Sequence, residues 1–230
     1  MSEFRALIFD LDDTLLDTSR LLVPQAERES CAAMIQAGLN ADLESCLKVR
    51  KRLIGQNLRT QIFEAIVREF GVNGSFSSEE VAQVGSRAFY EREVENHIYL
   101  EPEVIQLLAK LKSKYDLYLV TSGAPKTQKR KVEILKIENF FKNLFYVDLT
   151  KGETKAQAFR EIHRHTDIST QYFLSIGDRI DTDVADAKSL GMRACWVAKG
   201  EYAQLRPLTP LEEPDYRVNR VIEIESVCRL

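Results

Sequence analysis

Residues 9–15 read Phe9-Asp10-Leu11-Asp12-Asp13-Thr14-Leu15, which places three acidic side chains within four positions. The run before them, Ala6-Leu7-Ile8-Phe9, is apolar, as expected for a strand buried on both faces of a parallel sheet. The acids therefore begin where a strand ends, the position at which open α/β sheets bind ligands. Carboxylates this close repel one another unless a cation neutralises them. The stretch predicts a divalent metal site, with Asp10 and Asp12 available as nucleophile, ligand or proton-transfer group.

Composition limits the classes of protein to which the chain can belong. Its 230 residues, 44% of them hydrophobic, can bury the core of one domain and a modest insertion. A formal net charge of −3 gives no reason to expect nucleic acid or an anionic membrane as the partner, and no apolar run is long enough to span a bilayer. The four cysteines are far apart, which indicates neither a zinc site nor a disulfide framework. We therefore expect a cytoplasmic protein, a monomer or homodimer, with no nucleic-acid or membrane partner.

The pattern after the first strand is helical throughout residues 18–100. Asn40 can cap one helix, and Ser77 followed by Glu80 has the capping-box form that starts another. Apolar residues at helical spacing indicate four helices, and no strand signal interrupts them. The pattern predicts a compact, all-helical insertion over residues 18–100.

Strand and helix patterns alternate from residue 101 onward. Short apolar runs predict strands at five further positions: 117–120, 144–147, 173–176, 194–197 and 216–218. Apolar residues at helical spacing predict helices in most of the segments between these strands. Such alternation of strands and helices is typical of a doubly wound parallel sheet. We therefore expect an α/β fold in which a Rossmann-like core, residues 1–17 and 101–230, is interrupted by the helical insertion.

The second strand of this core ends in Thr121-Ser122-Gly123. A hydroxyl followed by main-chain amides, unencumbered at Gly123, can hold phosphate oxygens. The alternative is an ordinary strand-to-helix turn with an N-cap, but the acids at Asp10 favour phosphate binding. Basic residues follow at positions 126–131. They are either a solvated helix face or a source of positive potential at the mouth of a site.

A second group of acids follows a later strand, in the segment Ile176-Gly177-Asp178-Arg179-Ile180-Asp181-Thr182-Asp183. Asp178 is a candidate direct ligand for Mg²⁺, which prefers an octahedral shell of oxygens. Asp183 is either a ligand or a residue that orients one. Asp181 is expected to cap the helix that begins at Thr182.

These segments together resemble the motifs of the haloacid dehalogenase (HAD) superfamily. Residues 10–14 match the first motif, Asp-x-Asp-x-Thr, and Thr121 matches the second. Gly177-Asp178, followed by Asp183, resembles the fourth motif. A simple acidic helix cap at residues 10–14 would also explain the first match. The agreement of the later motifs in order and spacing favours the family instead.

The third motif of the family is a single lysine. Many family members carry this lysine in a Lys-Pro-x-Pro-x-x-Phe run, which is absent here, so more than one lysine is a candidate. Lys155 is the first candidate and Lys151 the second. The resemblance is to the C1-capped, phosphatase-like subfamily, and it implies that residues 18–100 form a helical cap. Within this segment, Arg52 and Arg59 are candidate contacts for an anionic substrate. The alternative is that they belong to a solvated helix face.

The resemblance also implies a mechanism. Asp10 would attack phosphorus and form an aspartyl-phosphate, while Asp12 would protonate the leaving alcohol and later deprotonate water. Mg²⁺ would be held by Asp10, the main-chain carbonyl of Asp12, and Asp178, with Asp183 as a further candidate. The phosphoryl group would be bound by a second set: Thr121, Ser122, Gly123 and Lys155. The expected activity is a Mg²⁺-dependent phosphatase acting on a small phosphorylated metabolite.

Three alternatives are compatible with parts of this resemblance. A β-phosphoglucomutase-like phosphomutase has the same cap and motifs, and the sequence does not exclude it. A haloacid dehalogenase uses the same nucleophile but needs neither magnesium nor the second acid, so Asp12 and Asp178 argue against it. A non-enzymatic HAD-like binding subunit would have no reason to keep so costly an acidic cluster.

Overall fold

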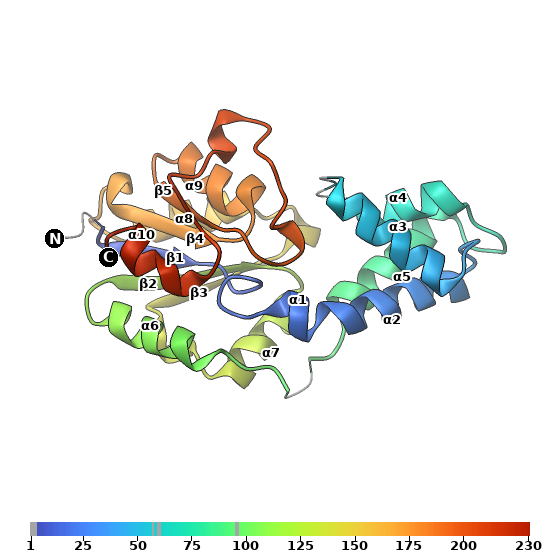
Figure 1. Ribbon diagram of the computed structural model, residues 1–230, viewed down its shortest axis with the longest axis horizontal. Coiled ribbons are helices and arrows are strands. Elements are labelled where there is room, and N and C mark those ends of the chain that lie inside the picture. Colours follow the sequence, from blue (N-terminus) through green and yellow to red (C-terminus); the bar gives the residue numbers. More distant parts are fainter. Residues whose placement is uncertain (1–3, 57, 59–60, 95–96) are drawn as a thin grey trace. The chain divides into compact units, whose positions relative to one another are not determined.

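The computed structural model describes residues 4–56, 58, 61–94 and 97–230 (Figure 1). The chain forms two compact units, one from Met1–Thr18 and Val94–Leu230 and the other from Ser19–Glu93. A parallel β-sheet organises the first unit, and the second is built from helices. The chain thus leaves the sheet after its first strand and returns to it before the second.

The first unit is built on a six-stranded sheet in the order β3-β2-β1-β4-β5-β6, with all neighbouring strands parallel. The strands are β1 (Ala6–Phe9), β2 (Asp116–Ser122), β3 (Asn143–Val147), β4 (Phe173–Gly177), β5 (Arg193–Val197) and β6 (Tyr216–Val218). Phe9 of β1 pairs with Leu119 of β2 and Ile176 of β4. The topological switch point of this order falls between β1 and β4, where open sheets bind ligands.

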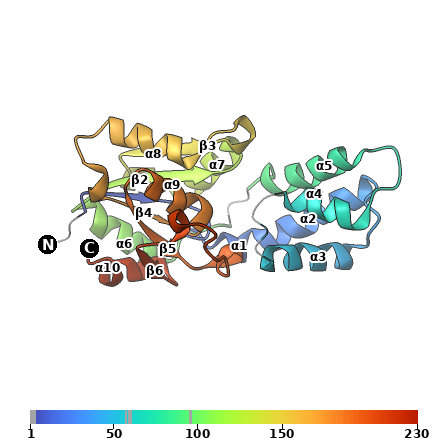
Figure 2. The same cartoon turned by 90° about the horizontal axis from the view of Figure 1, so that it is seen from above.

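Helices cover both faces of this sheet. They are α6 (Pro102–Lys112), α7 (Pro125–Leu135), α8 (Lys155–Arg164), α9 (Ala185–Ser189) and α10 (Ile224–Val227). Figures 1 and 2 show α8 on the face opposite α6. Ala6 and Ile8 of β1 belong to the same buried cluster as Phe159 of α8. Because successive strand side chains point to opposite faces, the buried Leu7 and Phe9 face the other layer.

The predicted fold class, α/β with a doubly wound parallel sheet, is confirmed, and each of the six predicted strands is present. The strand β2 differs most from its prediction, because it extends from Asp116 to Ser122 whereas the apolar run covers 117–120. Its pairing with β3 continues through Thr121 and Ser122. The apolar run marks only the hydrophobic part of the strand, while the ladder continues through the polar residues Thr121 and Ser122 to the edge of the sheet.

In its described residues, the second unit contains four longer helices. They are α2 (Val23–Gln36), α3 (Leu43–Gly55), α4 (Ile62–Phe70) and α5 (Ser78–Tyr90), and the short α1 (Thr18–Leu21) precedes them. Met34, Phe63 and Ile66 belong to a buried cluster of this unit. The predicted capping box is present, because Ser77 Oγ accepts from Glu80 N and the Glu80 carboxylate accepts from Ser77 N. None of the helices in the described residues is long and apolar enough to cross a bilayer.

The prediction that Asn40 caps a helix is wrong, because Asp42 caps α3. Asp42 Oδ1 accepts from Ser45 N at 2.9 Å, and Oδ2 accepts from Ser45 Oγ at 2.7 Å. Asn40 N instead donates to Gly71 O at 3.1 Å. The main chain at Asn40 is therefore paired with the segment after α4, and the helix starts two residues later.

The turn before this cap offers a test of local packing. Gly38 has φ +101° and an added Cβ would lie 2.1 Å from Asn73 O, whereas Gly74 has φ +115° and open space around it. Both Gly→Ala changes strain the backbone, but only the first creates a clash. We expect Gly38→Ala to lower the free energy of unfolding by about 3 kcal/mol or more and Gly74→Ala by about 1–2 kcal/mol. Urea unfolding followed by circular dichroism measures the difference, and equal losses would contradict the packing described.

Candidate active site

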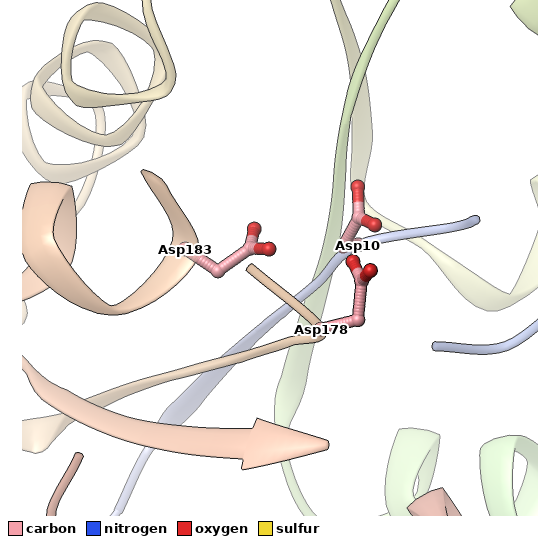
Figure 3. A group of neighbouring side chains, drawn as sticks. All are labelled: Asp10, Asp178 and Asp183. Carbon is pink, nitrogen blue, oxygen red and sulfur yellow. The ribbon is translucent and has the colours of Figure 1, made fainter. Parts of the chain in front are cut away.

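Three carboxylates meet at the carboxyl ends of β1 and β4. Asp10 directly follows β1, Asp178 directly follows β4, and Asp183 lies in the turn Ile180–Val184. One carboxylate oxygen from each residue lies within 4.8 Å of those of the other two. Figure 3 shows the three side chains directed toward a common space. Each residue is no more than 6% exposed, so the group is buried.

A glycine and a wide turn bring Asp183 to this group. Val184 N donates to Arg179 O at 3.2 Å, which closes a π-helical turn. The Asp183 side chain then lies against Gly177, where a Cβ would be only 2.1 Å from Asp183 Cγ. Ser175 Oγ donates to Asp183 O at 2.9 Å, and Arg179 N donates to Asp183 Oδ2 at 3.1 Å. The arrangement therefore requires glycine at position 177.

The prediction that Asp181 caps the following helix is wrong. The helical turn begins at Ile180, and its N-cap residue, Arg179, makes no side-chain capping bond. The Asp181 carboxylate accepts instead from Arg179 Nε at 2.8 Å and Nη2 at 2.6 Å. The guanidinium also lies over the Tyr202 ring, 4.0 Å from its centroid. Asp181 is inside the turn and fastens the loop that follows Asp178.

A buried lysine lies between two of the carboxylates. Lys155, the first residue of α8, is 4% exposed, and its Nζ donates to Asp10 Oδ1 at 2.6 Å and to Asp183 Oδ1 at 2.5 Å. Burial alone would lower the pKa of this ammonium, but the charges of the two carboxylates hold the pKa above its usual value. The side chain of Lys151, the second candidate, is 71% exposed and lies 3.6 Å from Asp148. The structure brings Lys155, not Lys151, to the acids.

The group carries more negative charge than Lys155 can neutralise. Burial raises the pKa of Asp10 to about 7, an effect that Lys155 opposes and that Asp183 and Asp12 increase. Burial, with the charges of Asp10 and Asp183, raises the pKa of Asp178 well above its ordinary value. Among the described residues, the Asp178 carboxylate has no hydrogen-bond or ion-pair partner. These oxygens fit a hard divalent cation such as Mg²⁺, because its charge would remove the repulsion.

The end of β2 presents a buried hydroxyl at the same edge of the sheet. Thr121 is fully buried, and its Oγ1 has no hydrogen-bond partner in the described part of the chain. The N–H of Gly123, predicted to hold a phosphate oxygen, donates instead to Val147 O at 3.1 Å. The carbonyl of Ser122 accepts from Gln128 Nε2 at 2.7 Å. An unpaired buried hydroxyl costs free energy, so the Thr121 hydroxyl is the group at this strand end best suited to a ligand.

Asp12 lies outside the three-carboxylate group and has its own partners. Lys131 Nζ lies 2.7 and 2.8 Å from its two oxygens, Gln128 Nε2 donates to Oδ2 at 2.8 Å, and Thr18 Oγ1 donates to Oδ1. Burial would raise the pKa of Asp12, but Lys131 and the other donors outweigh it and lower the pKa. The metal contact predicted for Asp12 is through its main-chain carbonyl and stays a prediction.

Sequence reasoning does not single out Gln128 or Lys131. Both lie on α7 and are three positions apart, so they share one helix face. Lys126, Lys129 and Arg130 of the same run are exposed. Treating residues 126–131 as one basic run conceals the inward face that the spacing of Gln128 and Lys131 could have indicated.

Comparison with known proteins identifies the family. A family model described as haloacid dehalogenase-like hydrolase matches residues 7–197. The chain belongs to the haloacid dehalogenase-like hydrolases. The prediction of a HAD-like hydrolase is therefore confirmed, and the matched segment contains Asp10, Asp178 and Asp183.

Several relatives of this HAD-like hydrolase match over nearly their whole length. Glyceraldehyde 3-phosphate phosphatase of Methanopyrus kandleri is 28% identical, over 98% of this chain and 97% of the relative. N-acylneuraminate-9-phosphatase of Rattus norvegicus is 24% identical, over 100% of this chain and 95% of the relative. The structure of the putative HAD-hydrolase YfnB from Bacillus subtilis, bound to magnesium, has a TM-score of 0.66 and 23% identity, covering 97% of both chains. This last similarity supports the fold.

Of the two arginines predicted to contact substrate, the structure describes Arg52. Arg59 lies outside the described residues. Arg52, on α3 of this HAD-like hydrolase, forms an ion pair with Glu69 of α4 and donates to Gln56 Oε1 at 3.0 Å. Its side chain is 44% exposed. Arg52 therefore joins two helices of its own unit, and a contact with substrate stays a prediction.

The uncompensated charge of this HAD-like hydrolase predicts how its stability depends on pH. Asp10 has a pKa of about 7 in the folded state against an ordinary value of 3.8, so the folded state binds more protons between these values. The contribution of Asp10 to the stability of the metal-free protein therefore falls as pH rises through this range and stays low above it. We expect Mg²⁺ to raise the unfolding temperature by more at about pH 8 than at about pH 5, because ionised carboxylates bind it. Thermal unfolding in EDTA and in Mg²⁺ measures both effects.

The change Asp178→Asn removes one of the repelling charges. We expect the metal-free variant to unfold at a temperature roughly 2–8 °C above that of the wild type, the shift that about 1–2 kcal/mol produces in a chain of this length. Its response to Mg²⁺ should be lost. Asp167→Asn, at an exposed position, is the matched control and should leave both quantities unchanged. A wild-type response to Mg²⁺ in Asp178→Asn would exclude Asp178 from the metal site.

Proposed function

We propose that this chain is a phosphatase that hydrolyses a small phosphomonoester with Mg²⁺ through an aspartyl-phosphate intermediate. The observation that carries the proposal is the buried group of Asp10, Asp178 and Asp183, with Lys155 bonded to two of them at one edge of the sheet. A carboxylate nucleophile beside an ammonium suits phosphoryl transfer, because phosphoryl oxygens need positive neighbours. The unpaired carboxylate of Asp178 could hold a divalent cation that adds to this positive charge. The names of the relatives, glyceraldehyde 3-phosphate phosphatase and N-acylneuraminate-9-phosphatase, support this activity.

Asp10 is the proposed nucleophile and Asp12 the proposed acid and base. An Asp10 oxygen forms a bond to phosphorus while the bond between phosphorus and the ester oxygen breaks. Asp12 gives its proton to that oxygen, so the leaving group departs as an alcohol. In the second half-reaction Asp12 takes a proton from water, the water oxygen bonds to phosphorus, and the bond from phosphorus to Asp10 breaks. Phosphate leaves, and both side chains return to their starting states.

Lys155 and Thr121 would hold the transferring group. The Lys155 ammonium balances charge on Asp10 and on the phosphoryl oxygens, and Thr121 Oγ1 donates a hydrogen bond to one of these oxygens. Ser122 ends the strand that presents Thr121, and Gly123 opens the turn into α7. The unpaired Thr121 hydroxyl supports this role, because a phosphoryl oxygen would satisfy it.

Asp10, Asp178 and the main-chain carbonyl of Asp12 would hold Mg²⁺, which supplies the remaining positive charge. Asp183 is bonded to Lys155 and to the main chain of Arg179, so we propose that it orients these groups. The magnesium bound to the related YfnB supports this choice of metal.

Substrate selection is the proposed role of the helical segment, residues 18–100, acting as a cap on a catalytic core of residues 1–17 and 101–230. Arg52 and Arg59 are the proposed contacts for an anionic part of the substrate. The relatives are named for glyceraldehyde 3-phosphate and an N-acylneuraminate 9-phosphate. Both names support a small phosphorylated metabolite as the substrate class.

Release of inorganic phosphate from a panel of phosphometabolites and p-nitrophenyl phosphate tests the proposal. We expect hydrolysis that requires Mg²⁺, is lost in EDTA, and falls below about 10⁻³ of the wild-type rate in Asp10→Asn, because the nucleophile is removed. Asp10→Ala guards against reversion of asparagine by deamidation. A phosphomutase would interconvert isomers without net phosphate release, and a protein that consumes nothing in the panel would not be a phosphatase.

The two candidate lysines give a matched pair of variants. Lys155→Met should lower kcat by about 10²-fold or more, because a buried ammonium next to the nucleophile is lost. Lys151→Met removes the same charge from an exposed position and should leave kcat within about 2-fold of wild type. Steady-state kinetics with p-nitrophenyl phosphate measure both. The opposite order of effects would assign the role to Lys151.

A further inference from the structure

Two side chains of α7 hold the Asp12 carboxylate. Lys131 Nζ lies 2.7 and 2.8 Å from the two oxygens, and Gln128 Nε2 lies 2.8 Å from Oδ2. Gln128 and Lys131 are one helical turn apart and project from the same face. Contacts to both oxygens fix the rotation of a carboxyl group as well as its position.

Burial distinguishes these two residues from the rest of the basic run. Gln128 is 3% exposed and the Lys131 side chain is 8% exposed, whereas Lys126 and Lys129 are exposed. Taking an ammonium out of water costs free energy that a specific partner must offset. Among the described residues, Asp12 is the partner that Lys131 has. Lys131 is therefore directed to Asp12 and is not a solvated surface lysine.

Gln128 also ties Asp12 to the end of β2. Its Nε2 donates both to Asp12 Oδ2 and to Ser122 O, at 2.8 and 2.7 Å. Both partners are acceptors, so the amide nitrogen must be the atom that faces them. A Cβ at position 123 would lie 2.9 Å from this nitrogen, and glycine there leaves room for it. The amide therefore sets Asp12 relative to the strand end that carries Thr121.

We propose that Lys131 and Gln128 are positioning residues that hold the Asp12 carboxyl group where it can transfer protons. The inference rests on the proposed phosphatase function, in which Asp12 protonates the ester oxygen and later takes a proton from water. Both transfers need a carboxyl oxygen within hydrogen-bond reach of the reacting oxygen. Free rotation of the Asp12 side chain would place it there only part of the time, which slows both half-reactions.

The experiment compares Lys131→Met with the wild type on two substrates. One is p-nitrophenyl phosphate, whose leaving group departs without a proton, and the other is the alkyl phosphomonoester that the wild type cleaves fastest. Since kcat/KM reports the steps up to the aspartyl-phosphate, we expect it to fall roughly 10²-fold for the alkyl ester and less than about 3-fold for the aryl ester. The kcat for the aryl ester should also fall, because hydrolysis of the intermediate needs Asp12 with both substrates. Gln128→Met should lower the same kinetic constants by smaller factors.

A double-mutant cycle tests whether Lys131 acts through Asp12. In an Asp12→Asn background, Lys131→Met should change kcat/KM for the alkyl ester by less than about 2-fold, because the group it positions is already lost. Lys131→Arg can contact both oxygens and should restore part of the activity. Lys126→Met, on the exposed part of the same helix, is the matched control and should behave as the wild type.

Two results would overturn the inference. If Lys131→Met lowers kcat/KM equally for both esters, or keeps its effect in the Asp12→Asn background, Lys131 has only a structural role. If the variant cleaves the alkyl ester faster than the wild type, the contacts restrain Asp12 instead of aiding it. A wild-type protein that releases no phosphate from either ester would mean that the proposed function itself fails, and this is seen before any variant is compared.

Discussion

The contact of the Lys155 ammonium with Asp10 and Asp183 is the interaction on which the site depends. Parallel pairing holds β1 and β4 side by side, so the acids at their ends cannot separate to relieve repulsion. At low dielectric such repulsion is large, and one buried cation opposes it. The start of α8 sets the position of that cation, because Thr154 caps the helix and Ala156 N donates to Asp186 Oδ2 at 2.9 Å. The start of α8 therefore determines how much of the negative charge of Asp10 and Asp183 is neutralised.

Asp10 and Asp12 are neighbours in the sequence but lie in opposite electrostatic surroundings. Burial among carboxylates raises the pKa of Asp10, whereas Lys131 and the other donors lower the pKa of Asp12. Two carboxyl groups with such different surroundings can have different tasks although their chemistry is the same. The strand end turns one side chain toward β4 and the other toward α7. In the metal-free protein these surroundings favour a protonated Asp10 and an ionised Asp12, whereas the proposed roles need an ionised Asp10 and a protonated Asp12. A divalent cation bound at Asp10 would favour the ionised form of that nucleophile.

The sequence predicted the sheet and the acidic group because both depend on regular geometry. Apolar runs mark buried strands, and parallel strands bring their carboxyl ends to one edge, so Asp10 and Asp178 could be expected to meet. The partners of Asp12 could not be expected in this way, since Lys131 is 119 positions away and its contact depends on how α7 docks. Which of Lys151 and Lys155 reaches the acids depends on where α8 starts. The two lysines are only about one helical turn apart in the sequence, so the pattern alone does not separate them. The capping roles assigned to Asn40 and Asp181 were wrong for two different reasons. The main chain of Asn40 pairs with Gly71, which is distant in the sequence, and the Asp181 carboxylate binds the side chain of its neighbour Arg179 instead of a main-chain N–H.

The π-helical turn at Ile180–Val184 has a consequence for insertions and deletions. Each residue advances a helix by about 100°, so removing one residue from this turn would rotate all that follows by that amount. Asp183 would then leave the space beside Gly177, and its carboxylate would no longer reach Lys155. The number of residues between Gly177 and Asp183 is therefore as constrained as their identities. A related chain with a shorter loop would have to supply this carboxylate from another position of its sequence.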